Sequence, residues 1–149
     1  MCSSRKYIFL LSLSLFACSS APVKDSAVKT ISPVQAVIAA AETAPYGVSG
    51  VFEMHIKGTG RQGDFIYLNS EKDYRDQRCL TLAIYPSVIP GFVRKYGADP
   101  DSYLKNKRVR VSGEARRVKI WFQSNGERTE SYYYQTHVLV TKTSQIEVL

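Results

Sequence analysis

Hydrophobic and polar residues alternate with a period of two over most of the chain beyond residue 47, a pattern that predicts β-strands with one buried face. In the first such segment, residues 49–58, Phe52 and Met54 alternate with Glu53 and His55. The alternation recurs in residues 64–69, 79–85, 104–122 and 127–142. The pattern therefore predicts five main strands, followed by a short last pairing close to the C-terminus, at Ile146 and Val148.

Two segments follow the helical period instead. In the first, an apolar stripe recurs at i, i+3, i+4 and i+7, at Val34, Val37, Ile38 and Ala41. Ser32 is a suitable N-cap, Pro33 suits the first helical position, and Gln35 completes a capping box. The second helix has the same spacing at Ile89, Phe92, Val93 and Tyr96, and Gly97 stands where helices commonly end. We expect the first helix to pack on the body of the domain.

Glycines and one Asn-Gly pair indicate how the strands connect. The segment GTGRQG, residues 58–63, is expected to form a loop, and SEKDYRDQR, residues 70–78, a charged connection. Gly113 interrupts the fourth strand, as glycines do at the bends of barrels. Asn125-Gly126 is a strong signal for a two-residue hairpin. The order is three strands, a helix and two strands, so periodicity alone predicts a small antiparallel barrel.

Three segments carry a resemblance to a known family, namely YLNSEKDYRDQRCLTLAIYP, LKNKRVRVSG and the terminal SQIEVL. They resemble the OB-fold region that is often appended to bacterial thermonuclease-like proteins, and the resemblance covers residues 47–149. It implies a mainly β domain, residues 32–149, with a five-stranded OB-fold-like Greek-key barrel, a helix between strands 3 and 4, and an additional N-terminal helix. The chain departs from the family between Arg116 and Tyr134, where a short hairpin becomes an extended ribbon.

The N-terminus has the pattern of a secretory signal. Arg5 and Lys6 precede an apolar run of about ten residues, shorter than the roughly 20 that a membrane-spanning helix needs. The run ends in Leu15-Phe16-Ala17-Cys18, which resembles a bacterial lipobox. The resemblance implies a signal peptide in residues 1–17, cleavage before Cys18, and a membrane anchor of palmitate and other acyl chains on that cysteine. An ordinary signal peptide with a chance cysteine is the alternative.

Residues 18–31 then comprise the lipidated cysteine and a flexible tether, because the sequence SSAPVKDSAVKTI is small, polar and aperiodic. Ser19 and Ser20, with no Asp after Cys18, resemble the sorting signal of outer-membrane lipoproteins. The expected location is therefore the outer membrane, with the domain lipid-anchored and facing the periplasm.

Composition excludes several classes of function. The formal charge of +7 falls to +5 when the two basic residues of the signal are removed, a modest excess compared with that of histone-like proteins. After lipidation of Cys18 and loss of Cys2, only Cys79 remains, so no intramolecular disulfide can form. His55 and His137 are isolated and are expected to be ordinary strand residues, so no metal site is predicted.

An enzymatic role is not expected. The chain has no G-x-S-x-G motif, Cys79 stands in mid-strand without a neighbouring histidine, and the acids and arginines of a thermonuclease core have no matching motif. No cofactor is predicted either. Asp73, Arg75 and Asp76 could hold a ligand or a metal, but the sequence favours a local salt-bridged turn at these positions.

Cations and aromatic residues occur where OB-folds bind oligonucleotides and oligosaccharides, on strands 2 and 3 and in the loops after strands 1 and 4. The candidate ligand-binding residues are Arg61, Phe65, Tyr67, Arg75, Arg116, Arg117, Lys119, Trp121 and Tyr133. The alternative is that these residues bind no ligand, because charged residues also keep exposed strand edges soluble and aromatic residues are common in strands.

The sequence thus predicts a non-enzymatic binding or interaction module of the cell envelope, which could dock to an envelope protein through its ribbon. The alternative is an OB-fold protein that binds nucleic acid or oligosaccharide; nucleic acid is the less favoured ligand, since it is scarce in the periplasm. The ribbon discriminates between these hypotheses. If Trp121 and residues 132–134 lie in the core, the docking hypothesis and the stacking hypothesis both weaken. If these residues form one exposed patch, a partner is implied.

Overall fold

The computed structural model describes residues 28–149, so the expected signal peptide, Cys18 and most of the expected tether lie outside the described residues. Ile31 forms a parallel β-bridge with Phe52, its N–H donating to the Val51 carbonyl at 2.8 Å. Ordered pairing therefore begins one residue before the expected domain boundary at residue 32. Between residues 28 and 149, no helix has the length and hydrophobicity needed to cross a bilayer.

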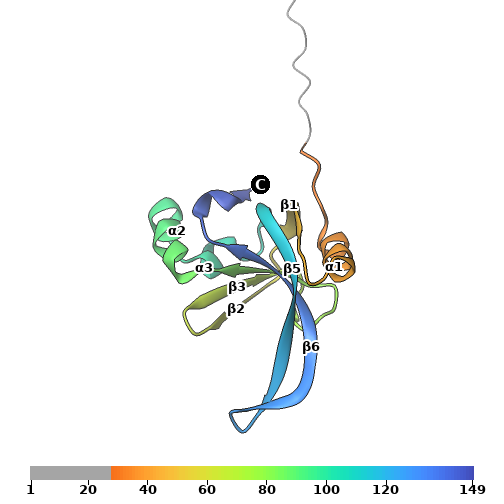
Figure 1. Ribbon diagram of the computed structural model, residues 1–149. Helices are drawn as coiled ribbons and strands as arrows, with labels where there is room; N and C mark the ends of the chain where they lie inside the picture. Colours follow the sequence, from red (N-terminus) through yellow and green to blue (C-terminus); the bar gives the residue numbers. More distant parts are fainter. Residues whose placement is uncertain (1–27) are drawn as a thin grey trace, which may run out of the picture.

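One seven-stranded sheet forms the body of the domain (Figure 1). Its strands are β1 (Val48–His55), β2 (Gly58–Gln62), β3 (Phe65–Asn69), β4 (Leu80–Ile84), β5 (Arg108–Ser124), β6 (Glu127–Val140) and β7 (Ile146–Val148). Along the sheet the order is β1-β5-β6-β4-β3-β2, and β7 pairs with β5 outside this path. All pairings between these strands are antiparallel except that of β4 with β6, which is parallel.

The two ends of this strand path are joined by only two residues of chain. The Ile56 N–H donates to the Lys107 carbonyl, on the side of β5, at 2.9 Å. The next N–H, of Lys57, donates to the Asn69 carbonyl of β3, also at 2.9 Å. The chain thus passes from pairing on the side of β5 to pairing with β3 within two residues. The sheet is therefore curled, and Phe52, Ile56 and the other inward side chains share one core.

The prediction of a mainly β domain is confirmed, but the count of five strands is wrong. The expected first strand ends at His55, and the expected GTGRQG loop is largely strand β2, paired with β3 from Gly58↔Asn69 to Gln62↔Phe65. Glycine-rich composition predicts a loop because glycine has no side chain to pack. Here the backbone ladder with β3 forms without such packing, and Gly63 takes the left-handed conformation, with φ +57°, at the turn.

Helix α1 (Pro33–Glu42) begins with the predicted capping box, in which Ser32 and Gln35 bond each other's backbone N–H groups. Its buried residues, however, are Ala36 and Ala40, not the expected apolar stripe. Val34 and Ile38 of that stripe are 45% and 53% exposed. The helix packs against β1 and β5 through its smallest side chains because these allow the closest approach of its backbone to the sheet.

A helical segment separates β4 from β5, as predicted. It consists of a 3-10 turn (Pro86–Val88), α2 (Ile89–Tyr96) and a short α3 (Pro100–Leu104) that the sequence did not predict. Phe92 of α2 and Leu104 of α3 are fully buried in the core. Gly97 ends α2 in the left-handed conformation, with φ +78°, as its position in the sequence indicates.

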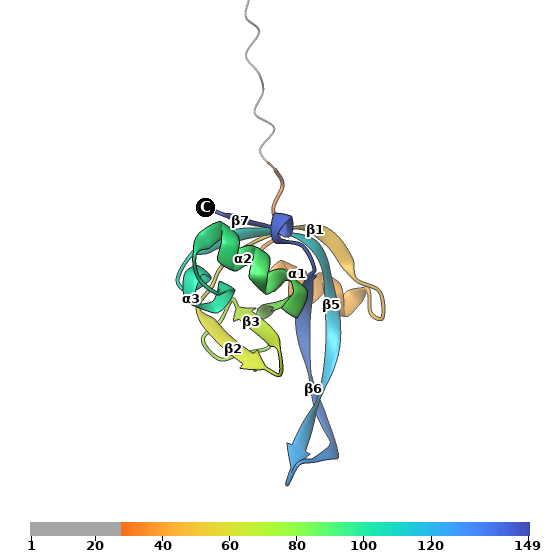
Figure 2. The same ribbon diagram turned by 90° about the vertical axis from the view of Figure 1, so that its left-hand side faces the viewer.

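The extended ribbon between Arg116 and Tyr134 is confirmed. Strands β5 and β6 run on as a pair to Ser124↔Glu127, and the turn residues Asn125 and Gly126 have φ angles of +54° and +82°. Beyond Ala115, β5 has no neighbour other than β6 among the described strands. Figure 2 shows the pair projecting from the body as a two-stranded arm, at the end opposite to the C-terminus.

Candidate functional site

Strand alternation places aromatic side chains on the outer surface of β3 and β6. Ile66 and Leu68 of β3 point into the core, so Phe65 and Tyr67 point outward. The Phe65 ring lies 4.9 Å from that of Tyr85 and 6.2 Å from that of Tyr67. The Tyr67 ring in turn lies 6.0 Å from that of His137 on β6. This surface, here called the aromatic face, comprises Phe65, Tyr67, Tyr85, Tyr133 and His137.

Hydrogen bonds continue the aromatic face along β6 towards the ribbon. The Gln135 side chain bonds His137 Nε2 through its carbonyl oxygen at 2.7 Å, and its amide group donates to the Tyr133 hydroxyl at 2.9 Å. Burial lowers the pKa of His137 to about 4 and raises the pKa of Tyr133. His137 is thus a neutral, hydrogen-bonded strand residue near pH 7, and Tyr133 is held in place by a partner two residues away.

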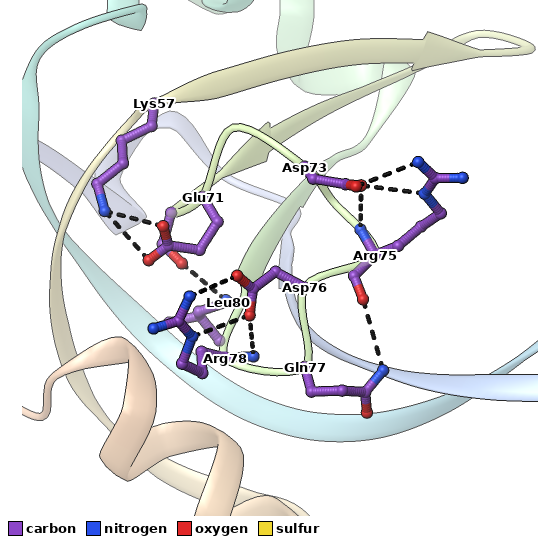
Figure 3. Close-up of polar contacts among 9 residues, drawn as sticks. Lys57, Glu71, Asp73, Arg75, Asp76, Gln77, Arg78 and Leu80 are labelled. Atoms are coloured by element: carbon purple, nitrogen blue, oxygen red, sulfur yellow. Dashed lines mark hydrogen bonds and ion pairs between the residues drawn. The ribbon is translucent and has the colours of Figure 1, made fainter.

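The charged connection between β3 and β4 borders the aromatic face, where the Gln135 amide group donates to the Tyr74 carbonyl at 3.5 Å. Most of its other side-chain contacts are within the connection itself (Figure 3). Arg75 folds back on Asp73, with Nε to Oδ1 at 3.1 Å, and Arg78 folds back on Asp76, with Nη2 to Oδ2 at 2.8 Å. Each aspartate also accepts the backbone N–H of its arginine, at 2.9 Å. Hydrogen bonds from Arg75 lower the pKa of Asp73, and those from Arg78 lower the pKa of Asp76 to about 2. The predicted salt-bridged turn is confirmed.

Arg61, a candidate ligand-binding cation, is engaged elsewhere. Its guanidinium bonds both carboxylate oxygens of Asp101 at 2.8 Å and Asp99 at 2.7 Å, and these contacts raise the pKa of Arg61. The contacts tie the β2–β3 hairpin to the start of α3. Arg116 is also paired, with Glu114 at 3.0 Å. Arg75 and Arg116, the candidate cations beside the aromatic face, are therefore both balanced by carboxylates.

The opposite face of the ribbon has a different chemistry. The alternation that turns Val111 and Ala115 of β5 into the core continues past the body of the domain, where it presents cations and aromatic rings instead. This surface, here called the cation–aromatic face, comprises Arg117, Lys119, Trp121, Arg128, Tyr132 and Tyr134. Its positive groups lie over rings: Arg117 is 3.8 Å from the centre of Tyr134, and Arg128 is 3.4 Å from that of Trp121.

Lys119 completes the cation–aromatic face. Its Nζ lies 4.4 Å from the ring centre of Tyr132 and 5.2 Å from that of Trp121. The Trp121 and Tyr132 rings are 5.2 Å apart in an edge-to-face contact, and Tyr132 meets Tyr134 edge-on at 5.4 Å. These separations fall in the range in which cation–π and aromatic pairs attract. The six side chains thus form one continuous cluster.

The structure separates the predicted site residues into three groups. Phe65, Tyr67 and Tyr133 lie on the aromatic face, with Arg75 beside it and Arg116 in register with His137. Three others belong to the cation–aromatic face, namely Arg117, Lys119 and Trp121. Arg61 lies at α3. The ribbon aromatics are neither buried in the core nor gathered in one patch, since Tyr133 faces away from its two neighbours.

Sequence reasoning missed three contributors to the aromatic face, namely Tyr85, Gln135 and His137, the last of which was expected to be an ordinary strand residue. Tyr85 contacts Phe65, and Gln135 joins Tyr133 to His137. The spacing of Tyr133, Gln135 and His137 at i, i+2 and i+4 is a signal that could have placed these three residues on one face of a strand. Nothing in the sequence indicates that β3 and β6 bring Tyr67 and His137 together, because both strands pair with β4 and not with each other.

Cys79 is a buried free thiol whose Sγ lies 3.7 Å from the Thr81 hydroxyl. Within residues 28–149, no three His, Cys, Asp or Glu side chains come together in a way that could hold a metal ion.

Comparison with protein families and with curated proteins finds no match. Among solved structures, the chain is similar to an aspartyl-tRNA synthetase from Entamoeba histolytica, with 11% identity and a TM-score of 0.43 over 98% of this chain and 28% of that one. It is also similar to a protein from Leishmania major Friedlin assigned as an aspartyl-tRNA synthetase, with 13% identity and a TM-score of 0.42 over 89% and 23% of the two chains. The chain thus spans about a quarter of the length of these proteins, and at these values neither likeness supports a conclusion about its function.

Proposed function

We propose that residues 32–149 form an OB-fold domain that binds a single-stranded nucleic acid on the aromatic face. The strand pairing supports the fold. When β1 and β2 are counted as one bent strand, the domain has five main strands, with helices between the third and the fourth. The third and fifth of these strands, β4 and β6, are paired in parallel. A partly open, five-stranded Greek-key barrel is the architecture of the OB-fold; β7 and the extended ribbon are additions to it.

The position of the aromatic face supports the site. OB-folds bind oligomeric ligands across their second and third strands and between the loops that follow the first and fourth strands. In this domain those elements are β3, β4, the β2–β3 turn and the β5–β6 ribbon. The observation that carries the proposal is the row of rings Phe65, Tyr67 and His137, which lies on this surface and continues through Gln135 to Tyr133. Stacking of bases on such rings requires no particular base sequence.

We also propose that the domain is held at the outer membrane by acyl chains on Cys18, facing the periplasm, and that its role there is non-enzymatic. The lipobox-like LFAC sequence and the polar segment that follows it support this location. The location and the ligand are separate proposals, and either can fail alone.

The test is a titration of the full chain, in non-ionic detergent, with a fluorescent oligothymidylate of about 20 nucleotides, which exceeds the roughly 4–16 that one OB-fold covers. Base stacking is worth about 1–3 kcal/mol, so Tyr67→Ala is expected to weaken binding about five- to 150-fold. Tyr46→Ala removes a tyrosine that is 76% exposed and lies outside both ribbon faces, and it should leave the affinity unchanged.

An absence of binding at low salt would overturn the proposal, as would equal affinity of the Tyr67 and Tyr46 variants. A neutral oligosaccharide that competes for, or alone occupies, the aromatic face would identify a glycan as the ligand instead.

Docking to an envelope protein is the second candidate, and the ribbon edges favour it. Along the projecting part of the ribbon, β5 and β6 pair only with each other among the described strands, so each has a backbone edge without a ladder partner. Such edges can accept a strand from another protein. A protein contact of this kind would depend weakly on salt, whereas nucleic-acid binding falls steeply with salt.

A further inference from the structure

We infer that the cation–aromatic face supplies the phosphate contacts for a nucleic acid whose bases stack on the aromatic face. The inference rests on the proposed function and assigns to the ribbon a role that the aromatic face cannot fill alone. Binding of a single strand needs both stacking surfaces and cations that track its backbone.

The balance of charge around the aromatic face is the first step. Arg75, Arg78 and Arg116 each hold a carboxylate at 3.1 Å or less. A phosphate that approached these arginines would have to displace a carboxylate that is already bonded. The aromatic face therefore provides rings but no uncommitted cation from this set.

The cations of the opposite face are different. Arg117, Lys119 and Arg128 take part in none of the ion pairs between residues 28 and 149, and their side chains donate no hydrogen bond to a protein group there. A ring beneath a cation holds it in place without cancelling its charge. The guanidinium and ammonium N–H groups stay free to donate to phosphate oxygens.

The two faces are close enough for one ligand to reach both. The ribbon is two strands wide, and paired strands lie about 5 Å apart. Tyr132, Tyr133 and Tyr134 are consecutive but alternate between the faces, so the aromatic and cation–aromatic faces lie back to back along β6. A flexible single strand that leaves the aromatic face at Tyr133 reaches Arg117 or Lys119 by passing one edge of the ribbon.

The position of the ribbon argues against an anionic membrane as the occupant. Figures 1 and 2 show the start of the described chain and the tip of the ribbon at opposite ends of the domain. A domain tethered through its N-terminal segment would point the ribbon away from its own membrane. The inferred occupant is therefore a single-stranded nucleic acid.

Salt dependence provides the test. For single strands, the logarithm of the binding constant falls with the logarithm of salt concentration by about 0.7 for each phosphate contact. The variant R117Q/K119Q/R128Q, as the full chain in detergent with the same oligothymidylate, should lower this slope by about 2. The matched control is R94Q/K95Q/K142Q, which removes the same charge from three residues that also lie outside the ion pairs and away from the ribbon. Far-UV circular dichroism of both variants verifies that they are folded.

The outcomes distinguish the inference from the proposed function. If the slope changes by the same amount in both triple variants, the inference is overturned. The proposed function still stands in that case, provided that Tyr67→Ala weakens binding. A slope that falls in the ribbon variant alone supports it. If the ribbon variant loses binding and Tyr67→Ala has no effect, the cation–aromatic face binds alone, and the proposed function fails together with the inference that rests on it. Absence of binding by the unmodified chain overturns both.

Discussion

His137 shows how a single residue on the aromatic face is controlled by its surroundings. The ring is largely desolvated, contacts Tyr67, and bonds Gln135 at 2.7 Å. Desolvation disfavours the charged imidazolium, which is why the pKa of His137 falls to about 4. The aromatic face is accordingly uncharged at this position near neutral pH, which suits stacking more than phosphate binding.

This shift predicts a pH-dependent stability. Between pH 6.5 and about 4, the unfolded chain binds a proton at His137 that the folded chain does not, so stability falls as the pH is lowered through this window. The largest loss is about 3 kcal/mol in the free energy of unfolding. We expect His137→Gln to reduce the difference in urea stability between neutral and acid pH. The exposed His55→Gln is the control, and an equal effect of the two substitutions would contradict the prediction.

Burial on α1 is also decided residue by residue. The alanines at positions 36 and 40 are fully buried, whereas the larger Val34 and Ile38 face outward. The two residues of each pair are four positions apart and therefore share one face of the helix, so spacing alone does not tell which pair contacts the sheet. In the structure, the face with the smaller side chains, Ala36 and Ala40, is the one that packs on β1 and β5.

At the scale of single elements, local signals were reliable at helix ends and turns. The Ser32 hydroxyl accepts the Gln35 N–H at 3.4 Å, and the Gln35 side chain accepts the Ser32 N–H at 3.0 Å. These contacts involve neighbours three residues apart, so they form as soon as the helix does.

The cap leads to a second prediction. Ser32→Ala removes the hydroxyl that caps α1 and should lower the free energy of unfolding by about 1 kcal/mol. Urea denaturation followed by circular dichroism measures the loss. Ser131→Ala, on the exposed ribbon, should change stability by less than about 0.5 kcal/mol. A cap variant as stable as the Ser131 variant would show that α1 is held by packing alone.

The β2–β3 hairpin depends on a contact that is not local. Arg61 reaches Asp99 and Asp101, which lie 38 and 40 residues further along the chain. All three side chains are partly exposed, so the contribution to global stability is small. The contact of Arg61 with Asp99 and Asp101 instead fixes the position of the β2–β3 hairpin, which borders the aromatic face.

A third prediction follows for this hairpin. Asp101→Asn weakens the two-oxygen contact with Arg61, and amide hydrogen exchange in residues 58–69 should become faster with little change in the denaturation midpoint. Exchange in β6 is the internal reference and should stay unchanged. Uniform acceleration in both regions would indicate a global effect instead.

At the scale of the whole molecule, the domain is a curled sheet with a ribbon at one end and the start of the described chain at the other (Figure 1). If Cys18 is acylated, as the sequence predicts, this arrangement directs the ribbon away from the membrane surface. The anchor and the projecting ribbon would then lie at opposite ends of one small domain.

The anchor gives a fourth prediction. Expressed in Gram-negative cells, the chain should incorporate labelled palmitate and sediment with the membranes, because several acyl chains give stable attachment. Cys18→Ser should abolish both properties. Cys79→Ser, which alters the buried thiol, should leave both intact. Palmitate that persists on the Cys18 variant would rule out the lipobox interpretation.

The sequence by itself determined which residues share a strand face and where several elements begin or end. Val109 and Val111 are buried beside the outward Arg108 and Arg110, and Asn125-Gly126 forms the hairpin turn, because alternation and turn conformation depend on near neighbours only. The same rule separated Val118, Ile120 and Phe122 from the face of Trp121.

Only the tertiary structure decided which strand faces meet and which charges remain free. The glycine-rich segment that became β2, the pairing of Arg61 with α3, and the contact of Tyr67 with His137 all join residues far apart in the sequence. Those contacts depend on the order of strands across the sheet, which no local pattern encodes. A list of arginines therefore could not show that Arg75 and Arg116 are balanced by carboxylates, while Arg117 lies over a tyrosine ring and has no carboxylate partner among residues 28–149.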